Sequence, residues 1–114
     1  MGETFNGVEV PDDPEMVSFG LIASAGEARS LAFQALAEAK AGNFEQADEY
    51  MEQSKAAGIR AHDQQTALLV NEANGNHLPV DVLLVHAQDH LMCAMLAQEL
   101  VAELIELHRN KQDK

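Results

Sequence analysis

The stretch Ala39-Lys40-Ala41-Gly42-Asn43-Phe44 is a turn signal between two long segments that favour helix. Gly42 is typical of the left-handed residue that follows a helix, and Asn43 is typical of the cap of the next helix, with Gln46 three positions on. A connection this short joins two helices as an antiparallel hairpin. The stretch therefore predicts that the segments on its two sides fold back against each other.

The segment before the turn has the pattern of a helix that begins beside Asp13-Pro14-Glu15, which combines a capping acid, a proline and a first-turn acid. Its small and apolar residues recur at spacings near three and four: Val17, Leu21, Ala25, Ala28, Leu31, Ala32, Ala35, Leu36 and Ala39. We expect a helix over about residues 15–41. Residues 1–12 show no usable periodicity, so we expect a flexible N-terminal tail over residues 1–14.

The segment after the turn predicts a second, more polar helix over about residues 44–73. The residues on its expected inner face are Phe44, Ala47, Met51, Ser54, Gly58, Ala61, Gln65 and Leu68. Glycine costs about 1 kcal/mol in a helix interior relative to alanine, so we expect a close packing contact at Gly58. Asn74-Gly75-Asn76 ends the helix, and Leu78-Pro79 favours an extended turn.

A third helix is expected over about residues 80–111, with Asp81 in its first turn. No strand pattern is found, so the sequence predicts an all-α fold. That fold is an antiparallel up-down-up three-helix bundle, which forms one domain over residues 15–114. The first half of the third helix is apolar nearly all round, and such a helix needs partners on every side. We therefore expect self-association with this helix on the inside.

The composition limits the classes of partner. Lys and Arg number 7 and Asp and Glu number 19, which gives a formal charge of 7 − 19 = −12. Such a surface repels nucleic-acid phosphates and anionic lipids. The single cysteine allows no intrachain disulfide, and we find no signal peptide and no run of about 18 apolar residues. We expect a cytoplasmic protein with no direct membrane insertion.

Four polar side chains interrupt the most apolar segment, which runs from Val82 to Leu96: His86, Gln88, Asp89 and His90. Burying such groups costs free energy unless they are paired, liganded or used. On a helix, His86 meets Asp89 at i+3 and His90 at i+4. A neutral imidazole is a good nucleophile and titrates near physiological pH, so His86 is a candidate nucleophile.

Structural alternatives stand beside this hypothesis. His86 could be a buried histidine bonded to a carboxylate, and Asp89 could form a salt bridge to Arg29 or Arg60. His86 and His90 also match half of a helical metal site, whose third ligand would be His62, His77 or Asp89. Cys93 is expected to be a small buried apolar residue. The remaining histidines are expected to be surface or structural residues: His62, His77 and His108.

The stretch Val85-His86-Ala87-Gln88-Asp89-His90-Leu91-Met92 resembles the lactose/cellobiose (including diacetylchitobiose) family of IIA components. These belong to the bacterial phosphoenolpyruvate-dependent sugar phosphotransferase system. The resemblance covers about residues 16–108. It includes four further stretches: Gly20-Leu21-Ile22, Gly26-Glu27-Ala28-Arg29-Ser30, Ala39 to Phe44, and Glu52 to His62 with Gln65-Thr66.

The resemblance implies a homotrimer with the third helix toward its axis. It also implies a phosphoryl relay, in which phospho-HPr phosphorylates the tele nitrogen of His86. His86 then passes the group to a cysteine of the IIB component of a cellobiose/diacetylchitobiose- or lactose-type transporter. Asp89 matches the aspartate that binds a divalent metal, usually taken as Mg²⁺, on the trimer axis. Gln88 and His90 stand beside these positions as supporting residues.

Two other classes of function compete with the relay. One is a non-catalytic helical adaptor with a structural polar core, and the other is a metal-dependent helical-bundle enzyme that uses His86 and His90. A histidine phosphotransfer domain is close in chemistry, but such domains usually place a lysine three residues after the histidine, where this chain has Asp89.

Overall fold

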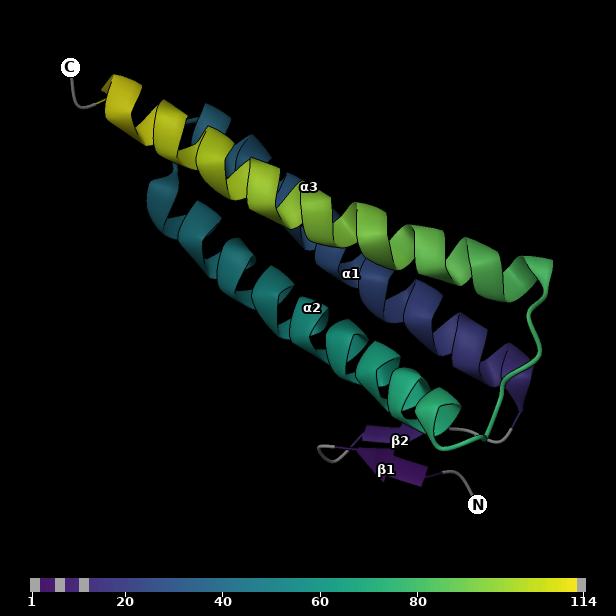
Figure 1. The fold of residues 1–114 in the computed structure, drawn as a ribbon. Helices are drawn as coiled ribbons and strands as arrows, with labels where there is room; N and C mark the ends of the chain where they lie inside the picture. Colours follow the sequence, from purple (N-terminus) through teal and green to yellow (C-terminus); the bar gives the residue numbers. More distant parts are fainter. Residues whose placement is uncertain (1–2, 6–7, 11–12, 113–114) are drawn as a thin grey trace.

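Three long helices dominate the computed structural model, which describes residues 3–5, 8–10 and 13–112, with side chains for residues 13–111. The helices are α1 (Pro14–Lys40), α2 (Phe44–Ala73) and α3 (Val82–Gln112). They run up, down and up in an elongated molecule of 56 × 27 × 19 Å (Figure 1). The predicted all-α three-helix bundle is confirmed, and each helix begins and ends within two residues of its expected bounds.

Two short strands, β1 (Glu3–Phe5) and β2 (Val8–Val10), precede the helices and pair antiparallel, with Glu3 opposite Val10. They lie against α2 (Figure 1). The expectation that the chain contains no strand was wrong here. The sequence did carry the signal, because Asn6-Gly7 between two short β-favouring runs is the pair that most favours a two-residue hairpin.

The N-terminal segment was expected to be flexible over residues 1–14. Its flexibility stays a prediction, and part of it lies outside the described residues, namely 1–2, 6–7 and 11–12. The described part shows that α1 already begins at Pro14.

Local chemistry sets most helix ends. Asp13 caps α1 by accepting a hydrogen bond from the Glu15 amide at 3.0 Å. Gly42 has a φ of 85°, the left-handed conformation expected of it. Asn43 is the N-cap residue of α2, as expected, but its side chain makes no capping bond, and its amide donates to Glu38 Oε2 at 2.9 Å. A capping bond would need the Asn43 side-chain oxygen as acceptor, and the bond of its amide to Glu38 turns the side chain back toward α1 instead.

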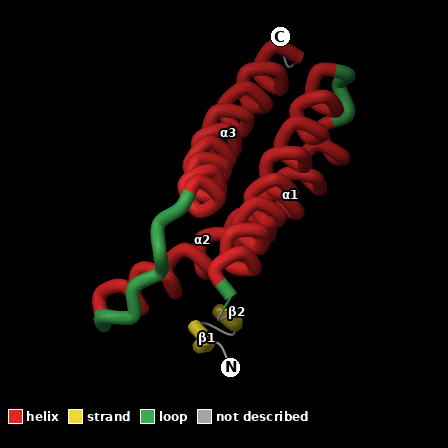
Figure 2. Tube along the Cα trace, turned by 90° about the vertical axis from the view of Figure 1, so that its right-hand side faces the viewer, coloured by secondary structure: helices red, strands yellow, loops and turns green. Residues whose placement is uncertain are grey.

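The third helix begins two residues later than expected, after the loop that crosses one end of the bundle (Figure 2). Asp81 is the reason, because its carboxylate accepts a hydrogen bond from the Leu84 amide at 2.8 Å. This is the geometry of an N-cap residue rather than of a residue inside the first turn. Asp81 therefore fixes where α3 starts, five positions before His86.

α1 lies between its two neighbours and packs along both of them, whereas α2 and α3 contact each other far less. Alanine makes up most of the buried apolar residues in these contacts, which allows the helix backbones to approach closely. The core consists of Val17, Leu21, Ala25, Ala28, Ala32, Ala35, Ala39, Ala47, Met51, Ala57, Ala61, Ala67, Ala87, Leu91, Ala94, Val101 and Ile105.

A small polar cluster inside the bundle joins all three helices. The buried Ser54 hydroxyl of α2 donates to the Ala28 carbonyl of α1 at 2.6 Å. Gln98 Nε2 of α3 donates to the Ser54 carbonyl at 2.7 Å and to its hydroxyl at 2.8 Å. A Cβ on Gly58 would lie only 2.8 Å from Gln98 Oε1, so the expected close contact at Gly58 is confirmed.

Large apolar side chains lie exposed along the side of α3 that faces away from α1. We call this set the α3 stripe, and its members are 41–87% exposed: Val82, Val85, Met92, Leu96, Leu100, Leu104 and Leu107. With the buried face on its other side, the first half of α3 is apolar nearly all round, as expected. Among the described residues, none of the helices has the length and apolar character that crossing a membrane requires.

Candidate functional site

The rings of His86 and His90 meet near the start of α3. Their Nε2 atoms lie 3.0 Å apart, and the ring planes are at 84° with centroids 4.5 Å apart. At this distance one ring donates an N–H to the lone pair of the other. The i, i+4 argument is confirmed, because helical geometry alone brings the two rings together.

His86 is exposed, so a reactant in solution can reach its ring. The alternative of a buried His86 bonded to a carboxylate was wrong, because α3 buries a different face against its neighbours. That buried face carries Ala87, Leu91 and Ala94. An exposed imidazole whose Nε2 is engaged by a second imidazole has the access that a nucleophile needs.

Gln88 lies on another side of α3 and does not join the histidine pair. Its Nε2 donates to Gln65 Oε1 of α2 at 2.7 Å, in a partly buried contact. This bond fixes the first turns of α3 to α2, where the two helices otherwise touch little. Gln65 was expected on the inner face of its helix. Its pairing with Gln88 depends on how α2 and α3 pack, which the sequence pattern does not predict.

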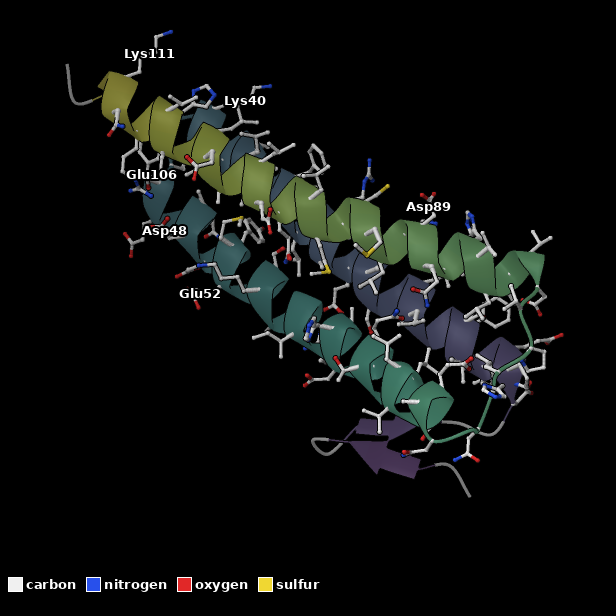
Figure 3. The ribbon with its side chains drawn as sticks, viewed as in Figure 1. Lys40, Asp48, Glu52, Asp89, Glu106 and Lys111 are labelled. Atoms are coloured by element: carbon white, nitrogen blue, oxygen red, sulfur yellow. The ribbon has the colours of Figure 1, made fainter. Side chains whose placement is uncertain are left out.

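Asp89 is exposed in the middle of the α3 stripe and points away from α1 and α2 (Figure 3). The alternative of a salt bridge from Asp89 to Arg29 or Arg60 was wrong. Arg60 pairs with Glu27 at 2.8 Å, and the Arg29 guanidinium lies over the Phe33 ring at 5.1 Å. Among the described residues Asp89 makes no salt bridge, so within this part of the chain its carboxylate lies on an apolar surface without a neighbouring cation.

Cys93 was expected to be buried, and this was wrong, since it is exposed one turn after Asp89. Its thiol lies 3.7 Å from Asp89 Oδ1, a weak hydrogen bond along the outer side of the helix. Burial could not be judged from the sequence here, because this part of α3 is apolar nearly all round and the sequence does not show which face packs against α1.

The structure does not support the alternative of a zinc site completed by His62, His77 or Asp89. His77 Nδ1 pairs with Glu72 at 2.8 Å, and His62 Nδ1 lies 3.9 Å from Asp63. Within the described part of the chain, no three His, Cys, Asp or Glu side chains come together in a way that could hold a metal ion. His62 and His77 are exposed, as expected.

The family model described as "PTS system, Lactose/Cellobiose specific IIA subunit" matches residues 16–109. The chain belongs to this family. The match spans all three helices and includes the histidine pair, and it confirms the resemblance drawn from the residues. A IIA subunit is a phosphotransferase component that carries a phosphoryl group, so this chain is one as well.

Relatives and solved structures agree with the assignment. The diacetylchitobiose-specific EIIA component of Escherichia coli K12 is 50% identical over 97 residues, which cover 85% of this chain and 84% of the relative. The cellobiose-specific enzyme IIA of Bacillus anthracis superposes with a TM-score of 0.88 at 44% identity, covering 92% of this chain and 96% of that one. The IIA subunit in the E. coli IIA(Chitobiose)–HPr complex gives 0.77 at 47% identity, covering 90% and 99%.

Proposed function

We propose that this IIA subunit accepts a phosphoryl group from phospho-HPr on His86. It then passes the group to a cysteine of the IIB component of a cellobiose/diacetylchitobiose- or lactose-type transporter. The observation that carries the proposal is the exposed His86, whose Nε2 lies 3.0 Å from His90 Nε2. The E. coli complex of a similar chain with HPr supports HPr as the donor. A relay between HPr and IIB places the subunit in the cytoplasm.

His86 Nε2 is a nucleophile only when it carries no proton. The proton then resides on His86 Nδ1, and the short contact between the rings requires His90 to donate its Nε2–H. The His86 lone pair attacks phosphorus, the N–P bond of the donor breaks, and its electron pair returns to the donor ring. When a thiolate attacks, the N–P bond at His86 breaks in the same way.

His90 and Gln88 support this exchange differently. Once His86 Nε2 is bonded to phosphorus, the neighbouring Nε2–H of His90 can donate to a phosphoryl oxygen instead, and this stabilises charge on the transferred group. Gln88 acts at a distance, because its bond to Gln65 holds the start of α3 on α2. Positioning of this kind is most of what phosphoryl transfer asks of a protein.

The proposed subunit forms a homotrimer through the α3 stripe, with α3 toward the axis. Exposed apolar surface of this extent on one helix supports an interface between copies. Asp89 lies within that surface, and three such carboxylates near an axis would repel one another. Oxygen ligands and negative charge suit Mg²⁺, which would offset much of this repulsion at the axis. We assign Mg²⁺ no part in the transfer step.

Phosphate transfer in a reconstituted relay tests the function. The protein is incubated with phosphoenolpyruvate, enzyme I and HPr, and acid-labile, base-stable phosphate on it is measured. We expect label on the wild type and on the matched control His77→Ala, and none on His86→Ala. Absence of label, or label that survives His86→Ala, would refute the relay and favour the non-catalytic adaptor.

A further inference from the structure

Two imidazole nitrogens that face each other on one helix can bind a metal ion as well as take part in phosphoryl transfer. His86 and His90 hold their Nε2 atoms 3.0 Å apart. Histidine is the commonest protein ligand of transition metals, and histidines at i and i+4 of a helix are half of many such sites. The two nitrogens of such a half-site lie side by side on one face of α3.

The separation of the two nitrogens is close to the value that one shared cation needs. At a metal–nitrogen bond length of about 2.05 Å, two nitrogens 3.0 Å apart subtend an angle of about 94° at the metal. This lies near the right angle of square-planar and octahedral sites, which Cu²⁺ and Ni²⁺ prefer. A tetrahedral Zn²⁺ site needs about 3.3 Å between the nitrogens, so the rings would open by about 0.3 Å.

We propose that His86 and His90 together bind one first-row divalent transition-metal ion, with Cu²⁺ and Ni²⁺ preferred over Zn²⁺, and that the bound ion blocks the phosphoryl acceptor. The binding half stands on the geometry of the two rings alone. The blocking half rests on the proposed function of His86. The site differs from the one proposed at Asp89, because it offers nitrogen rather than oxygen ligands.

Proton accounting allows both rings to bind one ion while they stay neutral. Each ring needs a free lone pair on Nε2, so the single proton of each ring resides on Nδ1. The proton that His90 now shares with His86 therefore moves to His90 Nδ1, and rotation of the exposed His86 ring turns both lone pairs toward one point. The charge of −12 on the chain favours any cation.

The ion would be held reversibly. The described residues bring no third His, Cys, Asp or Glu into ligand geometry with the pair, so water completes the coordination shell. Cys93 and Asp89 are the nearest candidates by sequence, and they contact each other at 3.7 Å. Because one lone pair on His86 Nε2 serves both the ion and the phosphorus, each excludes the other, and phosphorylation would release the ion.

Calorimetric titration of the full-length protein with NiCl₂, in excess MgCl₂, tests the binding half. We expect one Ni²⁺ per chain. His86→Ala, His90→Ala and His90→Gln should each weaken binding by about tenfold or more, because loss of a first ligand costs at least as much as loss of an outer-shell partner. The matched controls His77→Ala and Cys93→Ser should bind as tightly as the wild type. The site would be overturned if the His86 and His90 variants bound Ni²⁺ as tightly as the wild type, or if either control lost affinity.

The relay assay with and without Ni²⁺ tests the blocking half. We expect the rate of labelling to fall in step with Ni²⁺ occupancy and to recover when a chelator is added, while HPr in the same tube is labelled equally throughout. If Ni²⁺ binds and labelling continues unchanged, the blocking half is wrong. If the protein takes no label even without Ni²⁺, the proposed function fails and the calorimetric result still decides the site.

Discussion

Replacing Gly58 by alanine should destabilise the fold, although the change removes a glycine from a helix interior. On helix propensity alone the substitution would stabilise the protein by about 1 kcal/mol. The new Cβ, however, would lie 2.8 Å from Gln98 Oε1 and 2.9 Å from its Nε2, closer than real Cβ contacts allow. The Gln98 amide must therefore move away from α2.

The cost follows from the bonds that this amide makes. Gln98 Nε2 donates to two acceptors on Ser54, at 2.7 and 2.8 Å. At about 1 kcal/mol for each hydrogen bond, losing both costs about 2 kcal/mol. Ser54 still donates to the Ala28 carbonyl, so its hydroxyl does not become a buried group without a partner. Subtracting the propensity gain of about 1 kcal/mol leaves a net loss of about 1 kcal/mol.

Urea unfolding followed by circular dichroism, at one fixed protein concentration, measures this change. The decisive comparison is a double-mutant cycle, because Gly58→Ala in a Gln98→Ala background should stabilise by about 1 kcal/mol. Gly26→Ala is the matched control, since a Cβ there would meet no described atom within 4 Å. Gly26→Ala should stabilise the wild type and the Gln98→Ala variant equally. If Gly58→Ala does the same, the contact with Gln98 does not constrain this position.

Three further predictions concern the site and the start of α3. His90→Ala should slow the labelling of His86 by about one to two orders of magnitude without abolishing it. This rate loss is no larger than the loss caused by removing one preorganised hydrogen-bond donor from an active site. An unchanged rate would show that His90 takes no part in the transfer. A strong chelator should weaken the trimer in sedimentation experiments, and Asp89→Asn should reduce that sensitivity; a monomer with or without Mg²⁺ would count against the axial site. Asp81→Ala should lower the free energy of unfolding by about 1 kcal/mol through loss of the α3 cap, and no change in urea unfolding would show that its bond to the Leu84 amide contributes nothing.

The helices could be predicted from the sequence because their ends depend on local chemistry. A cap such as Asp13, or a left-handed glycine such as Gly42, acts on residues one turn away, and sequence spacing describes that turn fully. Asn43 shows the limit, because it takes the expected N-cap position while its side chain bonds to Glu38 of α1 and not to its own helix. The N-terminal hairpin was missed for another reason, because the Asn-Gly signal was present and was not used.

In the candidate site, too, features set by local helical geometry could be predicted, and features set by helix packing could not. The meeting of His86 and His90 follows from helical geometry, so the sequence was sufficient. The exposure of Asp89 and Cys93 depends on which face of α3 packs against α1. A helix that is apolar nearly all round does not reveal that face.

The alanine core limits how much hydrophobic free energy a single chain gains on folding. Burial of a methyl group contributes far less free energy than burial of a leucine or valine side chain, and most large apolar residues of α3 lie outside the core. In the proposed trimer, association of the copies would bury these residues and add hydrophobic free energy that the isolated chain lacks. Its melting temperature should then rise with protein concentration, because its stability would depend on the concentration at which the copies assemble.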